Sequence, residues 1–393
     1  MISKIENKDK IALVVVGYNR INSLKRLLIS LEAAQYPTSD IPLIISIDCS
    51  ENKELYSYVE QFVWTHGTKY VNIQKTRLGL IKHIYQCGDL TKLFKAVVLL
   101  EDDLFVSPYF YDYVLETVEK YGDNTQIAEI SLYKSETNGY VGLPFATLQD
   151  GNDVLLMQDV STWGQCWTEQ MWNGFIDWRD SHSDRDVEST DMPGEIKKWD
   201  RAWSKYYNAY VVNSCKYVLY PNISLTTNFS DAGEHGGTNN SAVQVSILQG
   251  KKKYILKELS ELTKYDIYGN NVRITEWLGM KPEEVCLDVY GIHSPSDDFL
   301  YILSTKAYPY KVIRSFALNL RPIELNVKYN VKGKGLFLYE IGKINSKNVY
   351  HYAKEVVPYF LKGFNNIELY FYIKEWLFDF IRCKFKKICF KRY

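Results

Sequence analysis

Val97-Val98-Leu99-Leu100-Glu101-Asp102-Asp103-Leu104 is the stretch that decides the fold, because here an apolar run ends in three consecutive acids. An apolar run of this length predicts a buried strand. Three carboxylates at its carboxyl end would repel one another unless a cation, typically a hard divalent one, lies among them. The alternative is an ordinary turn or helix start, since Asp often begins the next element.

Strand and helix patterns alternate through the residues that precede this run. The predicted elements lie, in order, at residues 11–16, 24–31, 41–47, 53–64, 70–74 and 79–94. This alternation favours right-handed crossovers and predicts an α/β fold, with a mainly parallel mixed sheet flanked by helices. Ligands bind beyond the carboxyl ends of such strands, and Arg20, Asp48 and the acids at 101–103 all fall there.

Composition narrows the class of protein. A chain of 393 residues predicts two domains, or one large domain with appendages. Lys+Arg and Asp+Glu balance at 47 each, so no overall field favours nucleic acid as a partner. Seven cysteines without a CxxC pair indicate reduced thiols, and the N-terminal sequence lacks a signal-peptide pattern, so we expect a cytoplasmic protein. No run of 18 apolar residues occurs, which predicts no membrane-spanning helix.

Three segments together resemble a known family. LVVVGYNR (13–20), IISIDCS (44–50) and VVLLEDDLFVSPYFYDY (97–113) are similar to the donor-binding half of GT-A-fold glycosyltransferases. The chain particularly resembles N-acetylglucosaminyltransferase I and related bacterial glycosyltransferases, which share the EDD form of the DXD motif. The resemblance covers about residues 11–240. It implies a metal-dependent, inverting transfer of a sugar from a UDP-sugar to a glycan acceptor.

The resemblance also divides the chain. It implies a Rossmann-like GT-A domain at 1–250, with a donor half at 11–125 and an acceptor half at 126–250. Residues 251–393 then form a C-terminal extension, which we expect to be helical or irregular, with a helix within 273–288 and a mixture of strand-like and irregular runs at 300–340.

On the donor side the resemblance assigns one role to each polar residue. The nucleotide is bound by Asp48 at uracil, Glu101 at ribose, Asp102 at the diphosphate, and by Arg20 and His83, while Mn²⁺ or Mg²⁺ is bound by Asp103. Three alternatives stay open: Arg20 packing its stem at a helix start, Asp48 serving a turn, and His83 lying exposed on a helix.

On the acceptor side, QDVSTWGQCW (158–167) resembles the strand and helix that floor the acceptor pocket. Trp163-Gly164 would place an indole beneath a sugar ring, or would simply pack in the core. Asp200 matches the general base of an inverting enzyme, although the family carries a second acid where Arg201 stands here. Asp191 or Glu195 are the other candidates for the base, and a surface helix acid is the plain alternative.

The segment 226–241, TTNFSDAGEHGGTNNS, is polar and rich in Gly and Asn. It resembles the family's loop that orders over bound nucleotide sugar, with His235 touching the diphosphate or the metal. An uncommitted surface loop is the alternative.

The tail at 367–393 mixes aromatic and basic residues, which is typical of a segment lying in an anionic membrane interface. The alternative is packing on this protein or a partner subunit. A membrane-seeking tail favours a lipid-linked acceptor at the inner face of the cell membrane, as in bacterial surface polysaccharide assembly. Two other functions stay open: a nucleotidyltransferase, although residues 17–20 hold one glycine only, and a catalytically silent carbohydrate-binding protein.

Overall fold

The computed structural model describes residues 7–200, 202–233, 241–296, 298–345 and 352–361, with single positions between 367 and 378. Its main feature is a nine-stranded sheet in the order β13-β9-β11-β6-β10-β4-β1-β2-β3. The strands are β1 (Asn7–Gly17), β2 (Leu43–Ile47), β3 (Lys69–Ile73), β4 (Phe94–Glu101), β6 (Ile127–Ser131), β9 (Val154–Met157), β10 (Gln165–Thr168), β11 (Tyr217–Pro221) and β13 (Lys264–Tyr265). The predicted mixed, mainly parallel sheet is confirmed.

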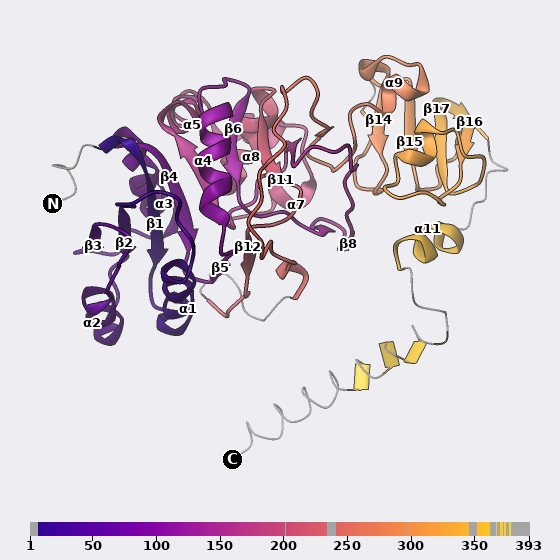
Figure 1. The fold of residues 1–393 in the computed structure, drawn as a ribbon. Coiled ribbons are helices and arrows are strands. Elements are labelled where there is room, and N and C mark those ends of the chain that lie inside the picture. The colour runs from indigo at the N-terminus through magenta and orange to yellow at the C-terminus, as the bar shows by residue number, and fades with distance from the viewer. Residues whose placement is uncertain are drawn as a thin grey trace.

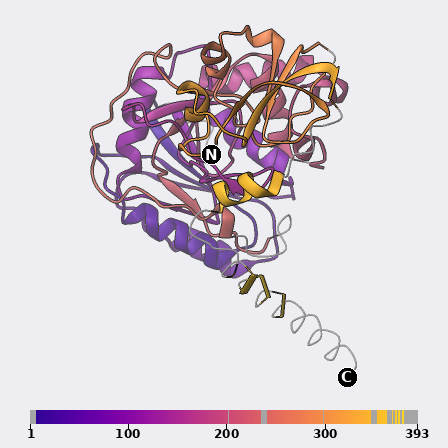
Figure 2. The ribbon, with the colours of Figure 1, turned by 90° about the vertical axis from the view of Figure 1, so that its right-hand side faces the viewer.

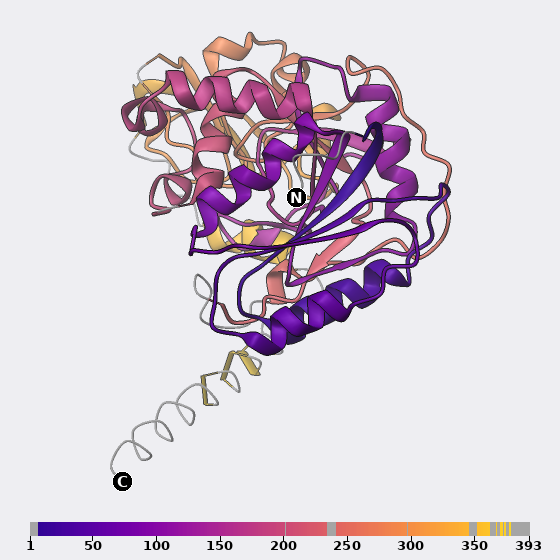
Figure 3. The same ribbon diagram turned by 90° about the vertical axis from the view of Figure 1, so that its left-hand side faces the viewer.

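Helices cover both faces of this sheet, as the view of the β1 to β4 side shows (Figure 3). They are α1 (Ile21–Glu32), α2 (Lys53–Gln61), α3 (Leu80–Gly88), α4 (Phe110–Tyr121), α5 (Glu169–Ser181), α6 (Asp184–Ser189), α7 (Gly194–Lys197) and α8 (Trp203–Asn213). A 3-10 turn, Asp89–Lys92, follows α3. In α1 the leucines at 24, 27, 28 and 31 form one buried stripe, because their spacing matches the helical period.

Parallel strands β2, β1 and β4 form the centre of the sheet. Residues 11–16 of β1 are buried, since β1 lies between two strands and under helices. Gly17 pairs with Ile47 of β2, and Val16 pairs with Glu101 of β4. The carboxyl ends of these three strands are therefore level with one another.

The apolar run that ends in acids does not continue as one strand. β4 ends at Glu101, Asp102 and Asp103 form a turn, and a short strand β5 (Leu104–Val106) follows. β5 pairs antiparallel with β12 (Thr226–Asn228), so residues far apart in sequence lie side by side near α1 (Figure 1). We call residues 101–103 the acid turn.

The C-terminal part contains a second sheet that the sequence prediction of helical, strand-like and irregular segments lacked. Its order is β14-β15-β17-β16, and its strands are β14 (Val285–Asp288), β15 (Tyr301–Ser304), β16 (Tyr310–Phe316) and β17 (Leu336–Ile344). The short helices are α9 (Ile274–Leu278), a 3-10 turn Pro282–Glu284, and α10 (Leu325–Lys328). We call residues 274–296 and 298–345 the C-terminal unit; it covers one end of the large sheet (Figures 1 and 2).

The helix expected within 273–288 is wrong beyond its first turn. Gly279 has a φ of +72° and caps α9, since a left-handed residue stops a helix. After the 3-10 turn at Pro282–Glu284, four buried residues form β14. The hydrophobic core runs without interruption from the large sheet into the C-terminal unit, and β13, at 264–265, belongs to the large sheet.

Small elements complete the described chain: β7 (Thr137–Asn138) with β8 (Leu143–Pro144), a 3-10 turn Ser241–Val243, and α11 (Tyr352–Phe360). The buried side chains of α11 include Val356, Tyr359 and Phe360. None of the helices in the described ranges has the length and apolar character required to cross a bilayer.

Candidate functional site

Polar residues gather where β1, β2 and β4 end. Arg20 follows β1, Asp48 follows β2, and the acid turn follows β4. Gly17 allows this closeness: a Cβ there would lie 3.0 Å from Ile47 Cδ1 and 3.8 Å from the carboxylate of Asp102. Polar residues from three strand ends thus meet at one edge of the sheet, where the sequence predicts a ligand-binding crevice.

Arg20 is the cation among the acids. Its guanidinium donates to Asp102, to Asp103 Oδ2 at 3.0 Å, and to the carbonyl oxygen of Asp231 at 2.9 Å. Both aspartates are largely buried, with side chains 5% and 13% exposed. The sequence analysis placed a metal among the acids, and the structure shows that a side chain of the protein already neutralises part of their charge.

One arginine does not balance the three acids. Burial raises the pKa of Asp102 to about 6, although Arg20 opposes the shift. Burial, together with the charges of Asp103 and Asp102, raises the pKa of Glu101 to about 8. Burial lowers the pKa of Arg20, but the two aspartates outweigh this effect and leave it raised. The acid turn therefore favours one more positive charge.

The acid turn fits a divalent cation that is bound partly by the protein and partly by a phosphate-containing molecule. Asp103 Oδ1 is buried and has no hydrogen-bond partner in the described structure. Across the described ranges, no group of three or more His, Cys, Asp or Glu side chains is arranged to hold a metal ion by itself. Mg²⁺ commonly binds through one or two carboxylates together with phosphate oxygens and waters, and this arrangement suits a single free oxygen of Asp103.

Asp48 is buried, and its carboxylate already organises the neighbouring loop. Oδ1 accepts N–H groups of Cys49 at 2.8 Å and Leu78 at 2.9 Å, while Oδ2 accepts the N–H of Gly79 at 2.9 Å. Gly79 has a φ of +76° and begins α3. Asp48 therefore fixes the start of α3 beside the crevice, and its predicted contact with uracil stays a prediction.

His83 lies under the crevice and is not an exposed helix residue. Its Nε2 lies 2.8 Å from Ser46 Oγ on β2, and the residue is buried. Burial lowers the pKa of His83, against an opposing effect of Asp48, so the ring is neutral at pH 7. This position favours a supporting role beneath β2 over direct contact with a donor.

The segment after β12 is tied to the acid turn. The N–H of Phe229 donates to the carbonyl oxygen of Asp103 at 2.9 Å. The Asp231 carboxylate accepts from Ser23 Oγ at 2.7 Å and from Arg26. The part of the predicted lid that ends at 233 thus lies on α1 and Arg20, whereas His235 lies outside the described residues.

Sequence reasoning missed Ser23, Arg26 and Asp231. The signal for the first two was available, because they follow Arg20 at three-residue steps and so share its side of α1. Asp231 carried no local signal, since its contacts come from a segment about 200 residues earlier. A further missed pair is Arg77, whose guanidinium carbon lies 4.7 Å from the ring centre of Tyr18 at the end of β1.

Trp163 and Gly164 lie next to the acid turn, at the start of β10. Trp163 is partly buried and meets Tyr133 edge to face, with ring centres 4.7 Å apart. Its neighbour Thr162 opposes the rise in the pKa of Glu101. Gly164 has a φ of +102°, and a Cβ there would lie 3.0 Å from Thr226 Cγ2. The predicted acceptor residues are thus close to the donor acids, and the stacking role of Trp163 stays a prediction.

The three candidate bases differ in what they contact. Asp191 is hydrogen-bonded to Tyr268 and paired with His293, and Glu195 pairs with Lys198 at 2.7 Å on the surface. Asp200 is exposed and precedes α8. Because α8 leads into β11, which is parallel to β6, its start lies towards the carboxyl edge of the sheet. Topology thus places Asp200 at the same edge as the acid turn.

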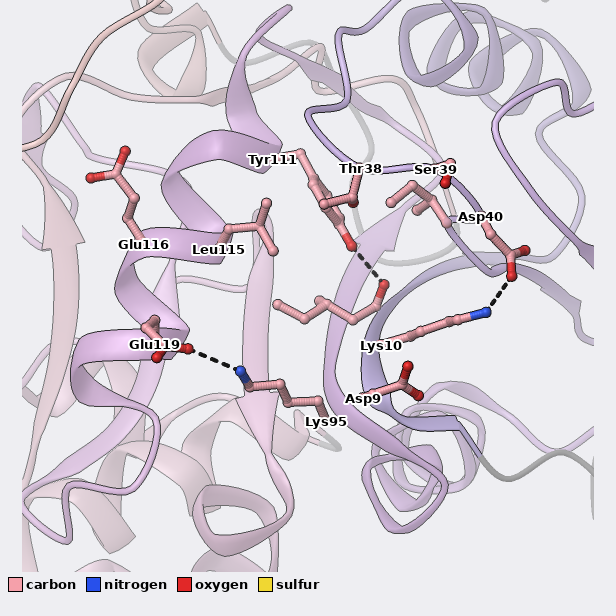
Figure 4. Close-up of a pocket in the computed structure, with 12 residues that line it drawn as sticks. Asp9, Lys10, Thr38, Ser39, Asp40, Lys95, Tyr111, Leu115, Glu116 and Glu119 are labelled. Atoms are coloured by element: carbon pink, nitrogen blue, oxygen red, sulfur yellow. Dashed lines mark hydrogen bonds and ion pairs between the residues drawn. The ribbon is translucent and has the colours of Figure 1, made fainter.

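A cavity of about 530 Å³ lies elsewhere, at the amino ends of β1 and β4 (Figure 4). Its walls carry the ion pairs Lys10–Asp40 and Lys95–Glu119, and Tyr111 Oη donates to the carbonyl of Ile11. These groups satisfy one another, and none belongs to the acid turn. The cavity therefore does not mark the candidate site.

No family model and no curated protein sequence matches this chain. Solved structures with partial similarity include S. aureus TarS 1-349 in complex with UDP-GlcNAc, with a TM-score of 0.37 and 14% identity over 57% of this chain and 60% of that one. GalNAc-T7 with UDP, GalNAc and Mn²⁺ gives 0.36 and 13% over 54% and 42%. The mannosyltransferase PcManGT from Pyrobaculum calidifontis, in complex with GDP-Man and Mn²⁺, gives 0.31 and 10% over 42% and 47%.

The match with that TarS structure leaves two fifths of its length without a counterpart here, since only 60% of it is covered. All of these TM-scores lie below 0.5. The roles of individual residues therefore rest on the contacts described above.

Proposed function

We propose that the protein is a metal-dependent, inverting glycosyltransferase that uses a nucleotide-sugar donor, most simply a UDP-sugar, and a glycan or glycolipid acceptor. The observation that carries this proposal is the acid turn: Arg20 bridges Asp102 and Asp103, while one buried oxygen of Asp103 keeps no partner. The expected relation to the GT-A family of N-acetylglucosaminyltransferase I agrees with this arrangement.

The residues of the crevice divide the work of binding a nucleotide diphosphate. Arg20 supplies a fixed positive charge beside the phosphates, and its bond to the Asp231 carbonyl orients it. Asp48 holds the loop before α3 at the nucleotide end, and Glu101 faces ribose.

Asp103 would hold Mn²⁺ or Mg²⁺, with Asp102 beside it. When bound, the metal supplies Lewis-acid stabilisation of the departing diphosphate. Asp200 takes the proton of the acceptor hydroxyl, and this oxygen attacks the anomeric carbon from the face opposite the diphosphate. The product then has the inverted anomeric configuration, with no covalent enzyme intermediate.

The test is incubation of the purified protein with a panel of UDP-sugars and GDP-sugars, with and without Mn²⁺. We expect donor-dependent thermal stabilisation and slow donor hydrolysis, both lost in Asp103→Ala. Asp123→Ala, which changes an acid at the opposite edge, is the matched control. Indifference to every sugar nucleotide, with or without metal, would overturn the proposal.

We further propose that the C-terminal tail lies on an anionic membrane surface. The described tail positions are exposed, and six of them carry large apolar side chains between 44% and 69% exposed: Ile367, Tyr370, Phe371, Ile373, Leu377 and Phe378. The sequence that follows is rich in Lys and Arg, which complements anionic lipid.

Cosedimentation with phosphatidylglycerol vesicles tests the tail. Replacing Lys384, Lys386 and Lys387 by Ser should weaken binding, whereas the same change at Lys328, Lys332 and Lys334 of the C-terminal unit should not. Equal sedimentation of both variants, or no binding of the wild type, would contradict a membrane role.

A further inference from the structure

His293 of the C-terminal unit contacts the segment that precedes Asp200. His293 Nε2 lies 3.2 Å from Asp191 Oδ2, in the connection between α6 and α7. The other oxygen of Asp191 accepts the hydroxyl of Tyr268 at 2.7 Å. The rings of Tyr268 and His293 stack, with centres 3.9 Å apart and an angle of 11° between their planes. Three segments distant in sequence thus meet at one carboxylate.

The protonation of His293 follows from its contacts. Its Nδ1 lies 3.1 Å from the carbonyl oxygen of Leu287, and its Nε2 faces the Asp191 carboxylate. A ring with protons on both nitrogens satisfies both acceptors. Burial lowers the pKa of His293, but the hydrogen bonds to Asp191 and Cys286 outweigh it and raise the pKa to about 11. The contact is therefore an ion pair at physiological pH.

Both partners of Asp191 are themselves held firmly. The Asp288 carboxylate accepts the N–H groups of Ile292 and His293, at 2.6 and 2.8 Å, and the hydroxyl of Ser304 at 2.7 Å. The turn that carries Tyr268 is held by Asp266, which accepts the N–H of Tyr268 at 2.9 Å. The C-terminal unit and this turn thus present a prearranged pair of donors to Asp191.

Other side-chain hydrogen bonds of the segment that carries Asp191 come from α8 and from the segment itself: Tyr206 donates to Asp184, and Asn213 donates to Thr190. Lys205 of α8 donates to Glu188 and to the carbonyl of Lys197, at 2.6 and 2.7 Å. Met192 and Ile196 are buried, but residues 198–200 are exposed. Asp200 follows directly, so the freedom of this segment decides how precisely its carboxylate is placed.

We infer that Asp191, Tyr268 and His293 form a latch, through which the C-terminal unit holds residues 184–200 in position for the transfer reaction. The inference rests on the proposed function and deepens it: Asp191 and His293 are positioning residues that act through Asp200. It also gives the C-terminal unit a task on the acceptor side of the site.

The test compares His293→Leu, Asp191→Asn and the double variant in the full chain. Each single change removes the same ion pair, so we expect kcat to fall about 5- to 20-fold in all three, with the donor KM unchanged. The double variant should be no worse than either single one, because the residues act as a unit. Lys311→Gln, which removes the Lys311–Glu340 contact of the same unit, is the matched control and should leave kcat unchanged.

Hydrogen exchange of peptides from 184–200 gives a second readout that needs no activity. Exchange should be faster in His293→Leu and Asp191→Asn than in wild type and Lys311→Gln. Unchanged exchange in both latch variants would overturn the inference. The inference would also be overturned if Asp191→Asn lost all activity while His293→Leu kept a normal rate. In that case Asp191 would be the catalytic base itself. A wild type without any transfer activity would instead refute the proposed function, and exchange alone would then decide whether the latch holds the segment.

Discussion

Replacing Glu129 by Gln should make the protein more stable at alkaline pH. Glu129 is fully buried in β6, and its Oε2 accepts Gln165 Nε2 at 2.6 Å and Trp167 Nε1 at 3.1 Å. Among the residues that the structure describes, neither its Oε1 nor the Oε1 of Gln165 has a hydrogen-bond partner. Burial outweighs these two bonds and raises the pKa of Glu129 to about 8. The folded protein thus keeps a proton that the unfolded chain releases.

The size of the effect follows from linkage. The pKa of Glu129 is about 8 in the folded state against an ordinary value of 4.5, so between these values the folded state binds one proton more. The free energy of unfolding then falls as pH rises, by about 1.4 kcal/mol per pH unit. Between pH 6 and pH 8 this group alone costs about 2 kcal/mol, allowing for partial titration near pH 8. The side-chain amide introduced by Glu129→Gln does not titrate in this pH range, so its stability contribution does not change with pH. The amide also provides a donor at the position of Glu129 Oε1, which lacks a partner in the described structure.

Urea unfolding followed by tryptophan fluorescence at pH 6 and pH 8 measures this difference. The stability of Glu129→Gln relative to wild type should rise by about 2 kcal/mol between the two pH values. Other titrating groups cancel, since both proteins contain them. Glu119→Gln, at an exposed acid of α4, is the control and should show no such change. Parallel curves for wild type and Glu129→Gln would refute the reasoning.

Three further measurements concern the crevice itself. Arg20→Met should lower the free energy of unfolding by about 3 kcal/mol without metal, because it leaves buried carboxylates unpaired. Adding Mn²⁺ should raise the melting temperature of this variant by more than it raises that of the wild type. Equal increases in both proteins would contradict this. The partly buried thiol of Cys49 should react more slowly with N-ethylmaleimide when UDP and Mn²⁺ are present, while the exposed thiol of Cys215 should react at an unchanged rate. Equal protection of both thiols, or of neither, would argue against nucleotide binding at the end of β2. Gly164→Ala should destabilise the protein by about 1–3 kcal/mol in urea unfolding, because its φ of +102° is left-handed, and a fully stable variant would show that the backbone relaxes there.

Three strands of the parallel half, β1, β2 and β4, were predictable because each is a local apolar run. β1, β2 and β4 are buried on both faces, and such strands need no partner to be recognised in sequence. The C-terminal sheet was not predictable in the same way. β14 and β15 have only four residues each, and β16 alternates between exposed and half-buried residues, so the patterns of these three strands are weak.

For the site, the sequence identified the acids and Arg20 but not their mutual geometry. The acids were expected around a metal, and the structure adds a contact that was not expected, in which Arg20 bridges Asp102 and Asp103. That contact depends on the register of β1 against β4, which no local pattern encodes. Asp191 was considered as a base from its chain position alone, whereas its partners come from residues 77 and 102 positions later.

Residues 104–106 cannot complete their pairing until residues 226–228 have left the ribosome, since β12 is their only strand partner in the described structure. Val106 and Thr226 pair across 120 residues, a separation that makes this contact a late one in folding. The nascent N-terminal half, although it carries all three acids, therefore emerges with its most charged turn unfinished. Expressed as a separate fragment, residues 11–125 would lack Phe229 and Asp231, and nothing would fix Arg20 from the solvent side. The acid turn is thus encoded early in the gene, but its contacts are complete only after residues 226–231 have been made.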